Sequence, residues 1–150
     1  CSNKQVKERD FTKDLNRLNI KYFRETSYDD IKKILKKEFP ESFWVAIKQN
    51  IENIEQVDFW LNIINDKNFK NDIVSSDKSF FDIAFNNLPK HIDQETWSKW
   101  TEQISDLTGR KGKDLFLSLR LALTGLKKGP EMNLLLPHIN RDLILKRLKA

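Results

Sequence analysis

Residues 108–125 read TGRKGKDLFLSLRLALTG, and this stretch indicates the fold class. Its apolar side chains recur at helical spacing, with Leu115, Leu119 and Leu123 four residues apart. Gly109 and Gly112 come before the apolar run, and Gly125 follows it, where helices commonly end. The stretch therefore predicts an amphipathic helix between two glycine-containing loops.

The same helical spacing extends over nearly the whole chain, and no segment shows the alternation typical of a strand. One predicted helix carries Phe11, Leu15, Leu18 and Tyr22 on a single face. Side chains that can cap helix N-termini occur at four places: Ser27, Asp77, Asp93 and Asn140. Prolines and glycines give the expected ends at Phe39-Pro40, Pro89, Gly109 and Gly125. We expect an all-α protein with about seven to nine helices.

A polar segment interrupts the pattern near the middle of the chain. Residues 65–78 are rich in Asn, Asp, Lys and Ser, and we interpret them as a loop or a poorly packed connector. This places a first helical subdomain at residues 1–65 and a C-terminal helical subdomain with basic loops at residues 77–150. The tryptophans keep core spacing, so we expect most of them to pack in the interior. They are Trp44, Trp60, Trp97 and Trp100.

The composition excludes several classes of site. The 150 residues include one cysteine, Cys1, and two distant histidines, His91 and His138, so neither a disulfide framework nor a zinc site is expected. The glycines form no GxGxxG or Walker A motif, and no GxSxG is present. No apolar run is long enough to cross a bilayer. Because the chain begins with Cys rather than Met, we interpret it as a processed product or part of a longer protein.

The positive charge is concentrated in the last third of the chain. Residues 108–150 contain ten Lys and Arg against three Asp and Glu, whereas the remaining 107 residues contain 17 against 19. Such a concentration is typical of a protein that binds a polyanion, although a solvated helical face has the same composition. The net charge of +5 therefore comes entirely from this region.

Two loops in this region combine glycine with basic residues. Small residues let a backbone approach a phosphate closely, and a following helix N-terminus attracts anions. Arg120 lies on the helix between the loops, where its guanidinium could reach a base edge or form an internal salt bridge. The predicted phosphate-binding residues of the two loops are Arg110, Lys111, Lys113, Lys127 and Lys128.

Residues 108–125, together with the Gly-Pro-Glu-Met step at 129–132, resemble the C-terminal part of bacterial glutamyl-tRNA synthetases. The closing segment INRDLILKRL, residues 139–148, is similar to the last helix of that family, with Asn140 in place of its usual glycine. The segment FTKDLNRLNIKYFR, residues 11–24, resembles the helix that follows the catalytic half of these enzymes. The resemblance implies an all-α anticodon-binding domain, the α-helix cage, with two packed helical subdomains.

The resemblance also assigns residues. The base-reading positions of the family fall on Arg120, Gly129, Pro130 and Met132. One of Lys48, Gln49 and Asn50 would read the wobble base. The family's strict enzymes carry an arginine in the helix over residues 43–54, and this chain has none there. Recognition of glutamine tRNA beside glutamate tRNA is therefore an open alternative.

These implications set the expected function. We expect anticodon recognition within a cytoplasmic, monomeric glutamate–tRNA ligase that uses ATP and magnesium. This chain has no catalytic residues of its own, because neither histidine stands in a class I signature and no KMSKS-like loop occurs. Two alternatives remain, a stand-alone RNA- or DNA-binding helical module and a domain that binds an acidic protein. No membrane partner is expected.

Overall fold

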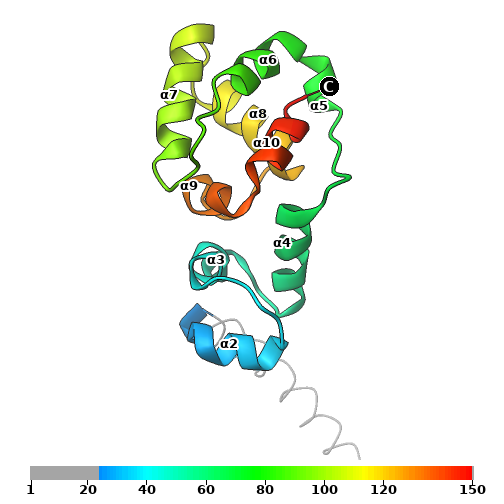
Figure 1. Ribbon diagram of the computed structural model, residues 1–150, viewed down its shortest axis with the longest axis vertical. Coiled ribbons are helices and arrows are strands. Elements are labelled where there is room, and N and C mark those ends of the chain that lie inside the picture. The colour runs from blue at the N-terminus through cyan, green and yellow to red at the C-terminus, as the bar shows by residue number, and fades with distance from the viewer. Residues whose placement is uncertain (1–23, 150) are drawn as a thin grey trace, which may run out of the picture. The chain divides into compact units, whose positions relative to one another are not determined.

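A computed structural model of the protein describes residues 24–149 (Figure 1). Those residues form nine α-helices and two short 3₁₀ helices, and no strand occurs among them. The all-α prediction is confirmed, and the predicted helix over residues 11–22 lies outside the described residues. The helices are α2 (Tyr28–Leu35), α3 (Glu41–Ile47), α4 (Glu55–Asn65), α5 (Ile73–Ser76), α6 (Lys78–Asn86), α7 (Thr96–Thr108), α8 (Lys113–Thr124), α9 (Met132–Leu135) and α10 (Arg141–Arg147).

The chain separates into two compact units, residues 1–59 and residues 60–150, and the boundary falls inside α4. The polar stretch 65–78 thus belongs to the second unit. Its interpretation as a plain loop was wrong, because it contains α5. Asn71 starts that helix, since its Oδ1 accepts from the N–H of Ile73 and its Nδ2 donates to the carbonyl of Leu121. The functional division at 1–65 and 77–150 stays a prediction.

In the first unit, the described part begins with a capped helix. Ser27 is the N-cap of α2, and its hydroxyl accepts from the N–H of Asp30 at 3.2 Å, as predicted. The helix ends at Leu35, because Lys36 takes the left-handed conformation (φ 54°), four residues before Phe39, where the Phe39-Pro40 step predicts the end. Trp44 is buried and its indole N–H donates to the carbonyl of Thr26 at 2.9 Å.

The next apolar stripe is also shorter than its spacing predicts. Helix α3 ends at Ile47, a 3₁₀ turn follows over Lys48–Asn50, and Ile51 is extended and fully buried. The chain therefore bends to bury Ile51 rather than continuing one helix to Ile54. Helix α4 then begins at Glu55 as a separate helix.

The second unit is built around α8, which packs against α5, α7 and α10 (Figure 1). Trp100 is fully buried at its centre, and its indole N–H donates to the carbonyl of Ala84 at 3.0 Å. Other large side chains of this unit with no exposure are Phe81, Ile104, Leu119, Leu123, Leu135, Leu136, Ile144 and Leu148. This core fixes the loops at both ends of α8.

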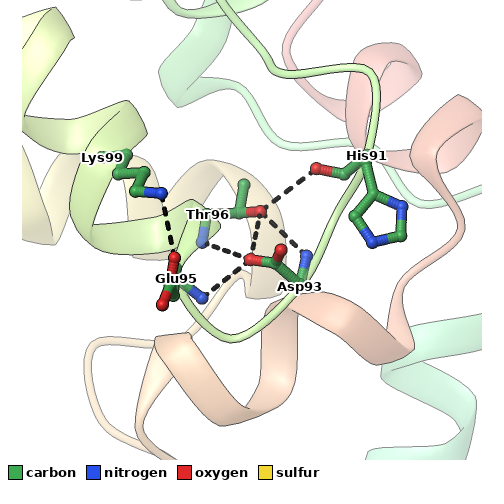
Figure 2. A network of polar contacts seen from close by, with 5 residues as sticks. All are labelled: His91, Asp93, Glu95, Thr96 and Lys99. Atoms are coloured by element: carbon green, nitrogen blue, oxygen red, sulfur yellow. Dashed lines mark hydrogen bonds and ion pairs between the residues drawn. The ribbon is translucent and has the colours of Figure 1, made fainter.

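Three residues of this unit are predicted to cap helix N-termini, and two of them make hydrogen bonds at a helix start. Asn140 caps α10 through the N–H of Asp142, as predicted. Asp93 accepts from the N–H groups of Glu95 and Thr96, while the Thr96 hydroxyl accepts from the N–H of Asp93, a reciprocal box that starts α7 (Figure 2). Asp77 makes no capping hydrogen bond, because its carboxylate is paired with an arginine of the first basic loop.

Candidate nucleic-acid interface

Three glycines set the backbone at the ends of α8. Gly109 ends α7 at φ 76°, Gly112 precedes α8 at φ 57°, and Gly125 ends α8 at φ 75°. These left-handed conformations are readily adopted only by glycine. Helix α8 is therefore held between two tight loops, named here loop 1 (residues 108–113) and loop 2 (residues 125–132).

Loop 1 is open to solvent. A Cβ added at Gly109 or Gly112 would meet no atom within 4 Å, so a ligand can approach the backbone at both positions. Lys111 and Lys113 are exposed, and no hydrogen bond or ion pair engages either side chain among the described residues. Lys113 also begins α8, where backbone N–H groups and the helix dipole favour an anion. Phosphate binding by Lys111 and Lys113 stays a prediction.

Arg110 is the member of loop 1 with an internal partner. Its guanidinium lies 2.6 Å from the Asp77 carboxylate and 4.1 Å from the centroid of the Phe80 ring. The side chain therefore ties loop 1 to the start of α6. A phosphate contact by Arg110 stays a prediction, and the Asp77 carboxylate would compete with it.

Loop 2 has a similar sequence but its glycines are packed. A Cβ at Gly125 would lie 3.3 Å from the Phe69 ring, and one at Gly129 would lie 2.5 Å from Cη2 of Trp60. Pro130 and Met132 are buried, and Pro130 precedes the N-cap of α9 rather than opening the helix. The exposed charged side chains of loop 2 are those of Lys127, Lys128 and Glu131.

Arg120 joins α8 to loop 2. Its Nη1 donates to the carbonyl of Pro130 at 3.0 Å, and the same nitrogen would lie 3.4 Å from a Cβ at Gly129. The side chain is half-buried, and burial lowers the pKa of Arg120. No carboxylate pairs with it among the described residues, so the partner is a backbone carbonyl rather than the salt bridge considered from sequence. The base-reading role of Arg120 stays a prediction.

The remaining arginines of the basic region also serve the fold. Arg141 donates to the carbonyls of Pro89 and Leu88 at 2.8 and 3.1 Å. Arg147 is 4% exposed and donates to backbone carbonyls near the ends of two helices, those of Ile63 and Asp66 and that of Leu123. Carbonyls at helix C-termini carry partial negative charge, which suits a buried cation.

Sequence reasoning counted Arg141 and Arg147 as part of a charged surface and missed these contacts. A signal existed for Arg147, since it stands three residues after Ile144 and one before Leu148, on the buried face of α10. The exposed positive charge of the two loops is thus carried by Lys111, Lys113, Lys127 and Lys128, and Glu131 of loop 2 is an exposed acid.

Comparison with known proteins agrees with this geometry. A family model described as an anticodon binding domain matches residues 79–150, which include α8 and both loops. Residues 79–150 are therefore similar to the anticodon-binding domain family. The resemblance drawn from residues 108–148 is thereby confirmed.

The whole chain resembles one kind of enzyme along most of its length. Glutamate–tRNA ligase 1 of Rickettsia prowazekii is 39% identical over 140 residues, which cover 90% of this chain and 31% of that protein. Glutamate–tRNA ligase 2 of Bartonella tribocorum is 38% identical over 141 residues, covering 90% and 31%. Glutamate–tRNA ligase 1 of Rickettsia massiliae is 40% identical over 143 residues, covering 91% and 32%. The chain thus spans about a third of these ligases and matches their C-terminal portion.

Other predicted positions lie outside the anticodon-binding domain match. Lys48, Gln49 and Asn50, the candidates for the wobble base, form the 3₁₀ turn after α3 in the first unit. Gln49 and Asn50 are exposed and Lys48 is half-buried. Their role stays a prediction. Of the tryptophans, Trp44, Trp60 and Trp100 are buried, as expected, and Trp97 is half-buried against Trp100.

Magnesium is implied for a complete ligase. Within residues 24–149, no group of three His, Cys, Asp or Glu side chains is placed to hold a metal ion. That part of the chain does not fit a magnesium site, and no chemical step is assigned to one. In the same residues, none of the helices combines the length and apolar character needed to cross a bilayer.

Proposed function

We propose that this chain binds the anticodon of glutamate tRNA within a glutamate–tRNA ligase. The observation that carries the proposal is the open loop 1 before α8, with two exposed lysines, inside a region that matches the anticodon-binding domain family. The names of the similar proteins support glutamate tRNA as the partner. Ligation of glutamate, with ATP and magnesium, would be the activity of the complete enzyme.

Binding would divide between phosphate contacts and base contacts. The ammonium groups of Lys111 and Lys113, with the first N–H groups of α8, would neutralise phosphates of the anticodon loop. Lys127 and Lys128 would do the same from loop 2. Arg120 keeps four of its five N–H donors beyond the bond to Pro130, which is enough for a two-point contact with a base. Single-stranded bases are read in this way on their exposed edges.

Glutamine tRNA is a second candidate partner. Its support is the absence of arginine from residues 43–54, where the resemblance places an arginine in the family's strict enzymes. The two tRNAs differ in the anticodon, so hairpins carrying either anticodon separate the candidates.

The test is a fluorescence-anisotropy titration of the full chain with a labelled anticodon hairpin. We expect Lys111→Glu with Lys113→Glu to weaken binding, and to reduce the slope of log affinity against log salt by about 0.7 for each lost phosphate contact. Lys90→Glu is the matched control, because Lys90 is exposed and belongs to neither loop. An equal loss in the control and the loop 1 variant would contradict the proposal.

A further inference from the structure

A second basic site borders loop 2, because a Cβ at Gly125 would lie 3.3 Å from the Phe69 ring that lines it. A pocket of about 350 Å³ opens between the segment before α5 and the end of α10, and no residue of loop 1 or loop 2 lines it. Figure 1 shows α5 and the end of α10 side by side, although some 70 residues separate them in the chain. The fold therefore brings together groups that the sequence pattern keeps apart.

The lining of this pocket is strongly positive. Lys70 comes from the segment before α5, whereas Lys146, Arg147 and Lys149 come from the end of the chain. Asp72 is the one acidic residue of the lining. No ion pair links these groups among the described residues. Four cations around one concave surface repel each other and focus a positive potential, which favours an anion.

The floor of the pocket supports the same conclusion. Arg147 is 4% exposed, and its Nε has no hydrogen-bond partner among the described residues. Its other nitrogens donate only to backbone carbonyls, and no carboxylate forms an ion pair with it among the described residues, although the nearby Asp66 carboxylate favours its charge. The Lys146 ammonium donates one N–H to the carbonyl of Lys67 at 2.6 Å, and two N–H donors remain.

An aromatic wall lies beside these charges. The Arg147 guanidinium lies 4.6 Å from the centroid of the Phe69 ring, and both side chains line the pocket. A ring that already stacks on a guanidinium offers flat apolar surface to a ligand next to the cations. A ligand that combines a phosphate with a flat ring matches both features, and a nucleotide is such a ligand.

We propose that this pocket binds a nucleotide, with its phosphate near Lys70, Lys146 and Lys149 and its base against Phe69. The nucleotide could belong to an RNA strand or be free in solution, since both present the same chemistry. The proposal does not rest on anticodon recognition, because neither loop takes part.

The test is a calorimetric titration of the full chain with uridine 5′-monophosphate and, separately, with inorganic phosphate. We expect the nucleotide to bind. The double variant Lys70→Glu with Lys149→Glu should lower its affinity at least about tenfold, because the substitutions reverse two charges. Lys90→Glu should change the affinity by less than about twofold, since it lies outside the pocket. Thermal unfolding of each variant checks that the fold is kept.

A second variant tests the aromatic wall. Phe69→Leu should lower the affinity for the nucleotide but leave the affinity for inorganic phosphate unchanged, because only the nucleotide has a ring to stack. Absence of any nucleotide binding at millimolar concentration would overturn the proposal, and so would equal affinity in the wild type and the Lys70/Lys149 variant.

Full-length tRNA separates the two sources. If the Lys70/Lys149 variant also binds tRNA more weakly, the nucleotide belongs to an RNA strand. If tRNA binding is unaffected while mononucleotide binding is lost, the ligand is a free nucleotide. Failure of the anticodon function has a different signature, in which the hairpin does not bind while uridine 5′-monophosphate does.

Discussion

Arg120 donates to the Pro130 carbonyl from α8, and Arg110, Arg141 and Arg147 likewise hold parts of the second unit together. A guanidinium suits such internal contacts because its planar group has several N–H donors. It can donate to two carbonyls at once, or form an ion pair while it stacks on a ring. The exposed positive charges of the two loops are lysines, whose flexible ammonium groups suit phosphates on a mobile strand. Residue type thus separates the charges that build the fold from those available to a ligand.

Arg120 is the residue for which a structural and a base-reading role can be separated. If it reads an anticodon base, Arg120→Ala should cost about 1–3 kcal/mol against the cognate hairpin and relax discrimination at one base. Arg120→Lys should not restore the discrimination, because an ammonium cannot make a planar two-point contact. Hairpins altered at one anticodon base each provide the measurement.

The opposite outcome has its own signature. If Arg120 only fastens loop 2 through Pro130, the alanine variant should weaken all hairpins equally and lower the melting temperature. That pattern would remove Arg120 from the base-reading residues.

Gly129 gives a prediction about stability. A Cβ at this position would lie 2.5 Å from the ring of Trp60, which is 5% exposed. We expect Gly129→Ala to lower the free energy of unfolding by about 1–3 kcal/mol through overpacking. Chemical denaturation measures the loss, and the double variant with Trp60→Phe should recover part of it, because the smaller ring leaves room. Strictly additive effects would show that the two residues do not collide.

At the scale of elements, the reciprocal box at the start of α7 links stability to pH. The N–H of Glu95, followed by the hydroxyl and N–H of Thr96, stabilises the carboxylate and holds the pKa of Asp93 below its usual value of 3.8 (Figure 2). Because the folded pKa is depressed, this contribution is fully present above about pH 4 and is lost as pH falls through the folded value.

We therefore expect the chain to lose stability below pH 4 in part through Asp93. Asp93→Asn keeps an acceptor for the two N–H groups but does not titrate, so its unfolding free energy should fall less steeply over the same range. Denaturation at a series of pH values compares the two proteins. Identical acid profiles would mean that Asp93 contributes nothing to the pH dependence.

Much of the element pattern could be predicted from the sequence, because helical spacing and caps act locally. Ser27, Asn140, Gly109 and Gly125 mark helix ends where the pattern places them. The failures come from tertiary contacts. Asp77 pairs with Arg110 instead of capping, and α5 forms in a polar stretch because Asn71 bonds to α8 and Val74 is buried.

The candidate site was predictable to a similar degree. Glycine and lysine in loop 1 indicated an open basic turn, and the structure has one. The same pattern in loop 2 gave no sign that Gly125 and Gly129 pack against Phe69 and Trp60, since those aromatics lie 56 and 69 residues earlier. Periodicity describes one helix at a time, so contacts between distant segments escape it.

For the whole molecule, the ten basic residues of the last third divide into an internal set and an exposed set. The net charge of +5 counts both sets together, so it does not measure either set alone. Affinity for RNA in general should follow the exposed lysines and fall with salt. Discrimination between anticodons should instead follow the groups that contact base edges.

The most direct test of the central claim compares anticodons in one RNA. The full chain is titrated with a hairpin carrying the glutamate tRNA anticodon and with the same hairpin after the anticodon bases are scrambled, at one fixed salt concentration. Anticodon recognition predicts at least about tenfold tighter binding to the first, since each base contact contributes about 1–3 kcal/mol. Equal affinity for the two hairpins would contradict the claim and leave only a sequence-independent basic surface.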